Sequence, residues 1–322
     1  MEKHVLVLLP VTEEQKQILM DMAPDAEFRF GERKTATRED VLWAHAIIGN
    51  PSGELLQGGA DHLEFLQLSS AGSETYVKPG LLSENTILCN ATGSYGPGIG
   101  EYMVAATLCH FRRLHIYRDQ QKAHTWLNLG RSRSCEESTV LVLGAGDIGS
   151  NYAKRMKALG CYVIGVRRSK KDNDMPDCFH EMHTIDELDA LLPRADAVGM
   201  ALPNTQSTAG LMDARRLGLM KPGSVLINVG RGNAIVTDAL MDALKNGPLG
   251  SAALDVTDPE PLPADHPLWD FDNLTITPHN NGGSTNGTKD RLFTICSENF
   301  RKYLAGEPLE QVDRLTGYKV SR

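Results

Sequence analysis

A buried strand, a glycine loop and a helix follow one another in the stretch TVLVLGAGDIGSNYAKRMKALG, residues 139–160. Three glycines lie between strand and helix in the pattern G-x-G-x-x-G: Gly144, Gly146 and Gly149. The first permits a tight turn, the second lets the backbone approach a pyrophosphate, and the third lets helix and strand pack closely. The amides of Asp147 and Ile148 then face the anion at the helix N-terminus, where the helix dipole also favours it. The stretch therefore predicts the first unit of a dinucleotide-binding domain.

Strand and helix patterns alternate on both sides of this unit. Downstream, the strand-like segments are CYVIGV, DAVGMALP, SVLINVG, SAALDV and NLTITP, which with TVLVLG make six strands of a doubly wound sheet. Upstream, they are HVLVLLP, AHAIIGN, LEFLQLSSAG and NTILCNATG. The run from Glu101 to Tyr117 contains no helix breaker and predicts a long connecting helix, and an amphipathic helix after Gly287 leads back to the first part. This alternation predicts an α/β protein with parallel sheets.

Composition argues against several other classes of protein. A length of 322 residues fits about two domains, and a net charge of -8 argues against a nucleic-acid partner. No apolar run reaches the roughly 18 residues that span a bilayer. The opening MEKHVLVLLPV lacks a small-residue cleavage site, and the six cysteines are scattered singly, as in a reducing compartment. We expect a soluble, cytoplasmic protein without a membrane partner.

The end of the second strand bears on which dinucleotide binds. In an NAD-binding unit an acidic residue about 20 residues beyond the glycines holds the ribose 2′-hydroxyl. Here that place holds Arg167, followed by Arg168 and Ser169, with no carboxylate among them. A guanidinium forms charge-assisted hydrogen bonds with a 2′-phosphate, and a serine hydroxyl adds another. The cluster favours NADP, with NAD still possible; the alternative interpretation is a solvated charged turn.

Polar residues follow three later strands of the same sheet, at the ends where open α/β sheets bind ligands. Arg231 comes directly after SVLINVG. Glu260 follows SAALDV within the loop TDPE, and His279 follows NLTITP. Each alone is a common loop residue, but together with the phosphate loop they mark this edge of the sheet as the place for a ligand.

Four longer motifs contain these positions: LVLGAGDIGSNYAKRMKALG, ALPNTQSTAGLMDARRLGLMKPGSVLINVGRG, AALDVTDPEPLPADHPLW and TPH. Over nearly the whole chain they resemble the D-isomer-specific 2-hydroxyacid dehydrogenase family. The resemblance implies a flavodoxin-like substrate domain of residues 1–103 and 293–322. It also implies an inserted Rossmann domain of residues 104–292 that binds NAD(P), with the active site in the cleft between the two.

The resemblance further implies that Arg231, Glu260 and His279 form the catalytic set, and the chemistry of these residue types agrees. Reducing a small 2-keto acid, such as glyoxylate or hydroxypyruvate, to the D-2-hydroxy acid needs a cation for the carboxylate and a proton donor for the C2 oxygen. Arg231 suits the first task and His279 the second. The Glu260 carboxylate favours the charged imidazolium and orients its ring. The nicotinamide supplies the hydride.

The same resemblance points to residues outside the catalytic set. In the loop SSAGSETY, the backbone amides of Ala71, Gly72 and Ser73 are expected to bind the substrate carboxylate, unless the loop is an ordinary strand-end turn. Asp255 is expected to accept a hydrogen bond from the nicotinamide carboxamide, unless it only caps the turn after its strand.

Three positions near the cofactor depart from the family pattern, and a proline adjoins one of them. Pro203 is expected to lie beside the cofactor, and Asn204 after it stands where the family commonly has threonine. Asn280 and Asn281 follow His279 where small or apolar residues are common. The two asparagines predict a more polar pocket on the nicotinamide side, whereas Asn204 is a modest change beside the cofactor.

Other functions remain open on this scaffold. A dinucleotide-sensing binding protein resembling the related corepressors would carry the same catalytic residues, and an NAD-dependent enzyme similar to phosphoglycerate dehydrogenase is a further alternative. Formate dehydrogenase fits less well, because that relative carries glutamine where Glu260 stands. No metal is expected, since Cys178, His180 and His183 have no fourth ligand nearby. Because the family pairs through the cofactor domain, near Trp126 here, we expect a homodimer.

Overall fold

Two helices mark where the chain passes from one structural unit to another. The computed structural model divides into a unit of residues 1–95 with 285–322 and a unit of residues 96–284. The structure describes residues 3–58, 60–168, 175–283, 285–315 and 319–321. The boundaries expected from the sequence fall inside helices α4 (Gly96–Phe111) and α10 (Asn286–Ala305), whereas the observed division lies where each helix begins. Each helix thus belongs whole to one unit.

The first unit is built on a parallel sheet in the order β2-β1-β3-β4-β5, which is the flavodoxin-like order expected from the sequence. Its strands are β1 (His4–Val7), β2 (Glu27–Phe30), β3 (Ala46–Ile48), β4 (Phe65–Gln67) and β5 (Ile87–Cys89). Its helices are α1 (Glu13–Met22), α2 (Arg38–Trp43), α3 (Gly53–Leu56) and α10. A two-stranded antiparallel pair, β13 (Glu310–Val312) and β14 (Lys319–Ser321), follows α10.

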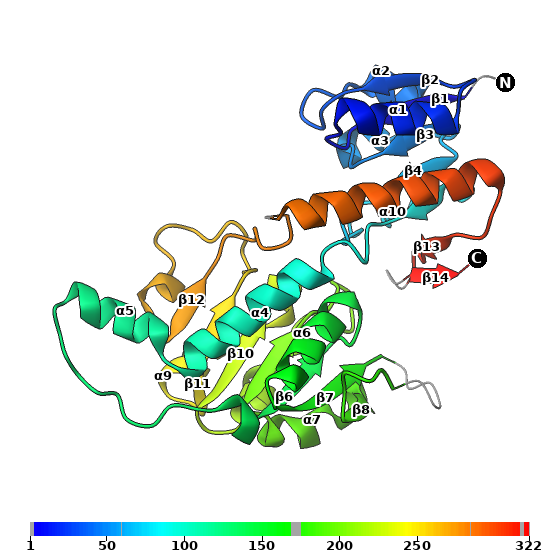
Figure 1. Cartoon of the computed structure of the whole chain (residues 1–322). Coiled ribbons are helices and arrows are strands. Elements are labelled where there is room, and N and C mark those ends of the chain that lie inside the picture. The colour runs from blue at the N-terminus through cyan, green and yellow to red at the C-terminus, as the bar shows by residue number, and fades with distance from the viewer. Residues whose placement is uncertain (1–2, 59, 169–174, 284, 316–318, 322) are drawn as a thin grey trace. The chain divides into compact units, whose positions relative to one another are not determined.

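Helices cover both faces of this sheet. Helices α1 and α10 lie on one face (Figure 1). There Leu19 of α1 and Phe300 of α10 are buried against the strands. On the other, Val41 of α2 and Leu56 of α3 fill the core. The sheet is therefore buried on both sides, as the continuous apolar runs of its strands require.

The second unit contains a parallel sheet in the order β12-β11-β10-β9-β6-β7-β8. Its strands are β6 (Thr139–Leu143), β7 (Tyr162–Arg167), β8 (Glu181–Thr184), β9 (Ala197–Met200), β10 (Ser224–Asn228), β11 (Leu249–Leu254) and β12 (Leu274–Ile276). Its helices, besides α4, are α5 (Leu114–Lys122), α6 (Asp147–Ala158), α7 (Leu188–Leu191), α8 (Ala214–Gly218) and α9 (Thr237–Lys245). The strand order reverses between β6 and β9, as in a Rossmann sheet.

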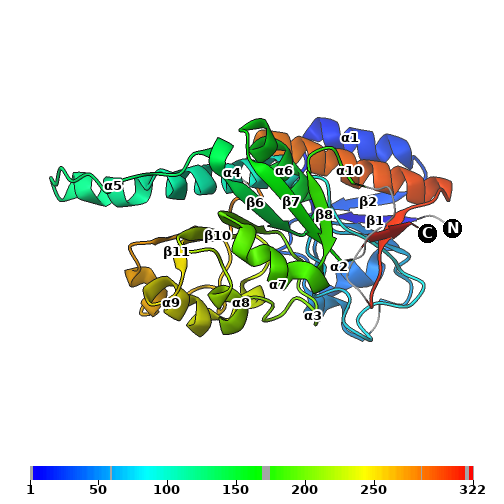
Figure 2. The same ribbon diagram turned by 90° about the horizontal axis from the view of Figure 1, so that it is seen from below.

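Figure 2 shows α4 and α6 on one face of this second sheet and α7, α8 and α9 on the other. The first β-α crossover, from β6 through α6 to β7, places the G-x-G-x-x-G loop at the carboxyl edge of the sheet. The loops after β9, β10, β11 and β12 leave from that same edge because all these strands are parallel.

Two local features differ from the sequence-based expectation. The long helix expected to reach Tyr117 ends at Phe111, and Arg113 with φ of 55° turns the chain into α5. An arginine at positive φ is uncommon, so nothing in the sequence signals this break. The edge strand β8, with the sequence EMHT, is a seventh strand; its short polar sequence lacks an apolar alternation. Across the residues described, no helix is both long and apolar enough to cross a bilayer.

Candidate active site

The three motif glycines occupy the junction of β6 and α6 for different steric reasons. Gly144 has φ of 97°, and a Cβ there would lie 2.6 Å from the Ala201 carbonyl oxygen. A Cβ on Gly149 would lie 2.0 Å from the Gly144 oxygen. Around Gly146, by contrast, no atom lies within 4 Å of an added Cβ. The loop is thus packed where helix and strand meet and open at the middle glycine, the arrangement a pyrophosphate needs.

Helix α6 begins in this loop. Gly146 precedes its first residue, Asp147, and Ile148 is the second. The Asp147 carboxylate is turned toward its own unit: Oδ2 accepts from the Gly96 amide at 2.9 Å, and Oδ1 accepts from Asn151 Nδ2 at 3.2 Å. The backbone amides of the first turn of α6 are the groups that suit an anion.

The basic cluster lies where β7 ends. Arg167 is the last residue of the strand and is half-buried, and Arg168 after it is exposed. Both side chains are cations, so neither would repel a 2′-phosphate. Ser169, expected to add a hydroxyl, lies outside the described residues.

His279 and Glu260 are brought together although 19 positions separate them. His279 Nδ1 lies 2.6 Å from Glu260 Oε1, and the two side chains are 45% and 41% exposed. His279 has φ of 48°, in the left-handed region that few residues with a Cβ adopt. The ring is therefore anchored through Nδ1, and nearly half of the side chain remains exposed.

Arg231 follows β10 at the same edge of the sheet. Asn228, the last residue of β10, holds the turn: its Nδ2 donates to the Arg231 carbonyl oxygen at 2.9 Å, and its Oδ1 accepts from the Gly230 amide at 3.0 Å. The guanidinium Nη1 donates to the Gly230 carbonyl oxygen at 2.8 Å. Sequence reasoning did not single out Asn228, although an asparagine at a strand end before a glycine is a signal for such a turn.

Asp255 lies one strand further along, next to the end of β11, and only 3% of it is exposed. Its Oδ1 accepts from Thr277 Oγ1 and from Asn281 Nδ2, each at 2.6 Å. The hydroxyls of Thr277 and Tyr102 lie 3.0 Å apart. Burial, and to a smaller extent the charge of Asp255, raises the pKa of Tyr102, which keeps its phenol protonated. Asp255 is thus part of a buried polar network.

Pro203 and Asn204 follow β9 on this edge. The Pro203 carbonyl oxygen accepts from Thr208 Oγ1 at 2.6 Å, and Asn204 Oδ1 accepts from Asn233 Nδ2 at 3.0 Å. The second bond ties the loop after β9 to the loop that contains Arg231. The departure from threonine at position 204 thus has a structural partner of its own.

Ala71, Gly72 and Ser73 belong to the first unit, in the loop after β4. Two side chains hold their carbonyl groups: Asn90 Nδ2, from the loop after β5, donates to Ala71, and Ser70 Oγ, from the loop after β4 itself, donates to Gly72, both at 2.7 Å. Ser73 is buried. A loop whose carbonyl oxygens are tied in this way can present its amides to an anion.

Asparagine and tyrosine residues that the sequence did not single out fix the start of the same loop. Asn50 Oδ1 accepts from the Ser69 amide at 2.7 Å, and Asn50 Nδ2 donates to Ser70 Oγ at 2.9 Å. Tyr95 donates its hydroxyl proton to the Ser69 carbonyl oxygen. Burial raises the pKa of Tyr95 to about 12, so it remains a donor at neutral pH.

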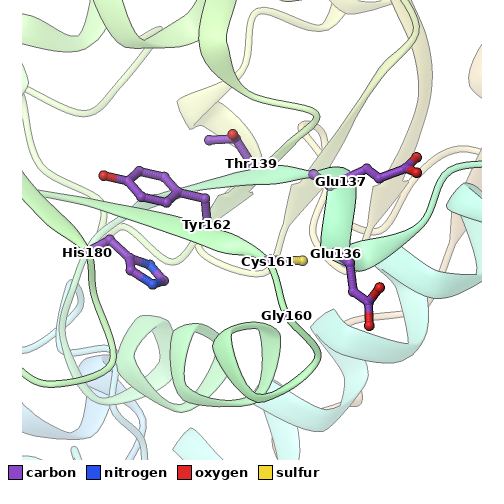
Figure 3. A pocket seen from close by; sticks show the side chains of 8 residues that line it. Glu136, Glu137, Thr139, Gly160, Cys161, Tyr162 and His180 are labelled. Carbon is purple, nitrogen blue, oxygen red and sulfur yellow. The ribbon is translucent and has the colours of Figure 1, made fainter.

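A separate pocket of about 340 Å³ lies at the opposite, amino edge of the second unit's sheet (Figure 3). Its lining residues are Glu136, Glu137, Ser138, Thr139, Gly160, Cys161, Tyr162 and His180. The Tyr162 and His180 rings stack at 4.6 Å between centroids. Ligands of open α/β sheets bind outside the carboxyl ends of the strands, so we do not assign the dinucleotide to this hollow.

Comparison with known proteins agrees with this geometry. Residues 104–281 match the family model described as "D-isomer specific 2-hydroxyacid dehydrogenase, NAD binding domain". The glyoxylate/hydroxypyruvate reductase A of Escherichia fergusonii is 30% identical over 279 residues, which are 85% of this chain and 87% of that protein.

Solved structures of the same family superpose on nearly the whole chain. A family protein from Aeromonas salmonicida has a TM-score of 0.84 with 32% identity, covering 98% of this chain and 100% of that one. The NADPH-dependent glyoxylate/hydroxypyruvate reductase of Sinorhizobium meliloti, solved with NADP and sulfate, has a TM-score of 0.82 with 26% identity and the same coverage. The chain therefore belongs to the D-isomer specific 2-hydroxyacid dehydrogenase family and is an NAD(P)-dependent oxidoreductase.

Proposed function

We propose that the protein reduces a small 2-keto acid of the glyoxylate or hydroxypyruvate class to the D-2-hydroxy acid, with NADPH as the hydride donor. The observation that carries the proposal is the 2.6 Å contact between His279 and Glu260 at the same sheet edge as Arg231 and the glycine loop. A proton donor with its own carboxylate, a substrate cation and a dinucleotide loop together define this reaction.

Each of the three residues has one task in this reaction. Arg231 pairs with the substrate carboxylate and polarises the C2 carbonyl. His279, whose Nδ1 is held by Glu260, donates the proton from Nε2 to the C2 oxygen as that oxygen gains charge. The negative charge of Glu260 favours the imidazolium form and fixes the ring. When bound, the dinucleotide supplies the hydride that adds to C2.

The described residues fit the dinucleotide that this reaction needs. The space around Gly146 and the first-turn amides of α6 suit a pyrophosphate. Arg167 and Arg168 suit a 2′-phosphate, which supports NADP over NAD. Asp255 is proposed to accept from the nicotinamide carboxamide through Oδ2, because Oδ1 already accepts two hydrogen bonds. Pro203 is proposed to lie beside the cofactor. The reductase of Sinorhizobium meliloti, which binds NADP, supports the same preference.

We assign the substrate carboxylate a second set of ligands, the backbone amides of Ala71, Gly72 and Ser73. The hydrogen bonds that Asn90 and Ser70 donate to the carbonyl groups of this loop support the assignment.

The experiment that tests this function follows the oxidation of NADPH and NADH by absorbance across 2-keto acids from glyoxylate to aromatic pyruvates. We expect turnover with glyoxylate or hydroxypyruvate and a higher kcat/KM with NADPH. His279→Ala is expected to lose at least about 10²-fold in kcat while still binding NADPH, as titrated by fluorescence. If neither cofactor supports turnover, or if His279→Ala keeps the full rate, the proposal is wrong.

We further propose a homodimer formed through the second unit. Helix α5 extends away from the sheet of its own unit in both views (Figures 1 and 2). Exposed apolar side chains lie on and after it: Leu114 (55%), Tyr117 (37%), Trp126 (103%) and Leu127 (58%). An apolar surface between α4 and α6, including Val104, Leu108 and Leu159, belongs to the same unit. Clustered apolar exposure of this kind supports a subunit contact.

We place the protein in the cytoplasm. All six of its cysteines are free thiols, the state that a reducing compartment maintains. Cell fractionation with detection of the native protein tests this location, and recovery in a secreted or membrane fraction would contradict it.

A further inference from the structure

The side chain of Asn281 bridges two segments that end at the catalytic edge of the second unit. Its Nδ2 lies 2.6 Å from Asp255 Oδ1, next to the end of β11, and 3.0 Å from Thr277 Oγ1, after β12. Thr277 in turn donates to the same carboxylate oxygen at 2.6 Å. The three side chains form a closed triangle of hydrogen bonds.

Chemistry fixes the orientation of this amide. A carboxylate oxygen only accepts, so the group of Asn281 that faces Asp255 is the NH2 group. The bond is charge-assisted and Asp255 is only 3% exposed, conditions in which a hydrogen bond is strong. Asn281 therefore anchors the segment after β12 more firmly than a small or apolar residue at this position would.

The anchored segment contains His279. Thr277 and Asn281 flank it on either side, and the His279 amide donates to the Thr277 carbonyl oxygen at 3.0 Å. His279 itself has φ of 48°, a backbone conformation that residues with a Cβ rarely adopt unless the surroundings impose it. The bonds donated by Asn281 close the turn on the far side of this residue and so help to impose that conformation.

We propose that Asn281 is a positioning residue that locks the turn bearing His279 onto the buried carboxylate of Asp255. The inference rests on the proposed function, because it gives His279 the role of proton donor. Asn281 exerts its role through His279 and not on the substrate itself. It sets where the imidazole stands relative to Glu260 and hence to the C2 oxygen, and a displacement of about 1 Å in such a group lowers rates by on the order of 10²-fold.

The test compares Asn281→Ala with a matched control, Asn273→Ala. Asn273 Nδ2 also donates two hydrogen bonds, to the carbonyl oxygens of Leu244 and Gly250, but at the amino edge of the same sheet. Asn281→Ala is expected to lower kcat about ten- to a hundredfold and to leave the Kd for NADPH within about twofold, because Thr277 still holds Asp255. Asn273→Ala is expected to keep kcat within about twofold. Equal kcat values in the two variants would overturn the proposal.

A double-mutant cycle with His279→Ala separates positioning from a general loss of structure. If Asn281 acts through His279, adding Asn281→Ala to His279→Ala lowers the residual rate no further. An additional loss equal to that of the single variant would show a separate role and refute the inference. Full turnover by His279→Ala would instead refute the proposed function, so the two failures are distinguishable.

Hydrogen-deuterium exchange gives a readout that needs neither cofactor nor turnover. In the cofactor-free protein, the peptide that contains His279 is expected to exchange faster in Asn281→Ala than in the parent, whereas Asn273→Ala leaves it unchanged. Unchanged exchange in Asn281→Ala would overturn the proposal.

A second variant covers the case in which Asn281→Ala does not fold. Asn281→Asp keeps the size of the side chain but places an oxygen against Asp255, so the two carboxyl groups must share a proton to stay in contact. Its kcat relative to the parent is expected to fall as the pH rises and that proton is lost. A ratio independent of pH between 5 and 9 would contradict the proposed lock.

Discussion

At the scale of single residues, the proposed chemistry depends on the negative charge of Glu260 as much as on the length of its side chain. Glu260→Gln keeps the length of the side chain and an oxygen that can accept from His279 Nδ1, but it removes the negative charge that favours the imidazolium. We expect kcat to fall by about 10²-fold with little change in the KM for NADPH. Steady-state kinetics measure both, with the exposed Glu298→Gln as control. An unchanged kcat would mean that Glu260 only supports its loop.

A second residue-scale prediction concerns the choice of cofactor at Arg167. Replacing it with Asp removes a guanidinium that suits a 2′-phosphate and introduces a carboxylate that suits a ribose hydroxyl. A charge-assisted hydrogen bond contributes about 1.5–3 kcal/mol, so the ratio of kcat/KM for NADPH over NADH should fall roughly ten- to a hundredfold. Lys154→Asp, the same charge change on an exposed position of α6, should leave the ratio unaltered. If both variants give the parental ratio, the cluster is a solvated turn.

At the scale of secondary-structure elements, two glycines of the β6-α6 junction are expected to have different roles, one in cofactor binding and the other in stability. An added Cβ at Gly146 meets no protein atom within 4 Å, so Gly146→Ala should keep the melting temperature of the parent but lose NADPH binding, because the methyl occupies the space for the pyrophosphate. Gly149→Ala should lower the free energy of unfolding by about 1–3 kcal/mol, because its Cβ would overlap the Gly144 oxygen. Thermal melting and fluorescence titration of both variants check this contrast. Equal behaviour of the two would contradict it.

The edge strand β8 has a pH-dependent anchor. Hydrogen bonds from Arg194 lower the pKa of Glu181 to about 2. At His183, burial lowers the pKa, but hydrogen bonds with Glu187 and Glu181 outweigh it, so the pKa of His183 is raised. The folded state thus favours protonated His183. Its stabilising contribution is fully present below the ordinary value near 6.5 and is lost as the pH rises through the raised pKa.

Because protonated His183 stabilises the folded state, we expect the melting temperature of His183→Asn to lie a few degrees below that of the parent at pH 6. At pH 9 the two melting temperatures should be nearly equal. Melting curves between these values measure the effect, with the exposed His124→Asn as control. A difference that grows with pH would mean that His183 is favoured in its neutral form.

The sequence predicted the features that a local pattern specifies and missed those that depend on residues far apart in the chain. The glycine loop, Arg231 and His279 each follow an apolar strand, so their placement at one sheet edge was predictable. The 2.6 Å contact of Asn281 with Asp255 depends on the register of β11 against β12, which no single segment specifies. Helix α4 ends before Arg113, whose positive φ no sequence pattern predicts. Strand β8 is too short and polar to show the alternation of a strand.

At the scale of the whole molecule, the prediction concerns association. The parent is expected to sediment at twice the 35.2 kDa of one chain. Trp126→Glu should shift it toward the monomer, because a charge would replace a fully exposed apolar ring beyond α5. Leu315→Glu, at a residue that is 98% exposed in the first unit, serves as the control. Analytical ultracentrifugation decides the question, and a monomeric parent would rule out the dimer.

The first unit draws its core from both ends of the chain. Phe300 and Cys296 of α10 are buried with Val5 and Val7 of β1, so the part of this face that α1 does not cover stays exposed until α10 is made. On a ribosome adding roughly 5–20 residues per second, synthesis of residues 96–305 takes on the order of ten to forty seconds. During that interval the nascent sheet exposes that part of its apolar face while the second unit is already being completed. The order of translation thus leaves the surface that α10 covers exposed for much of the synthesis of the chain.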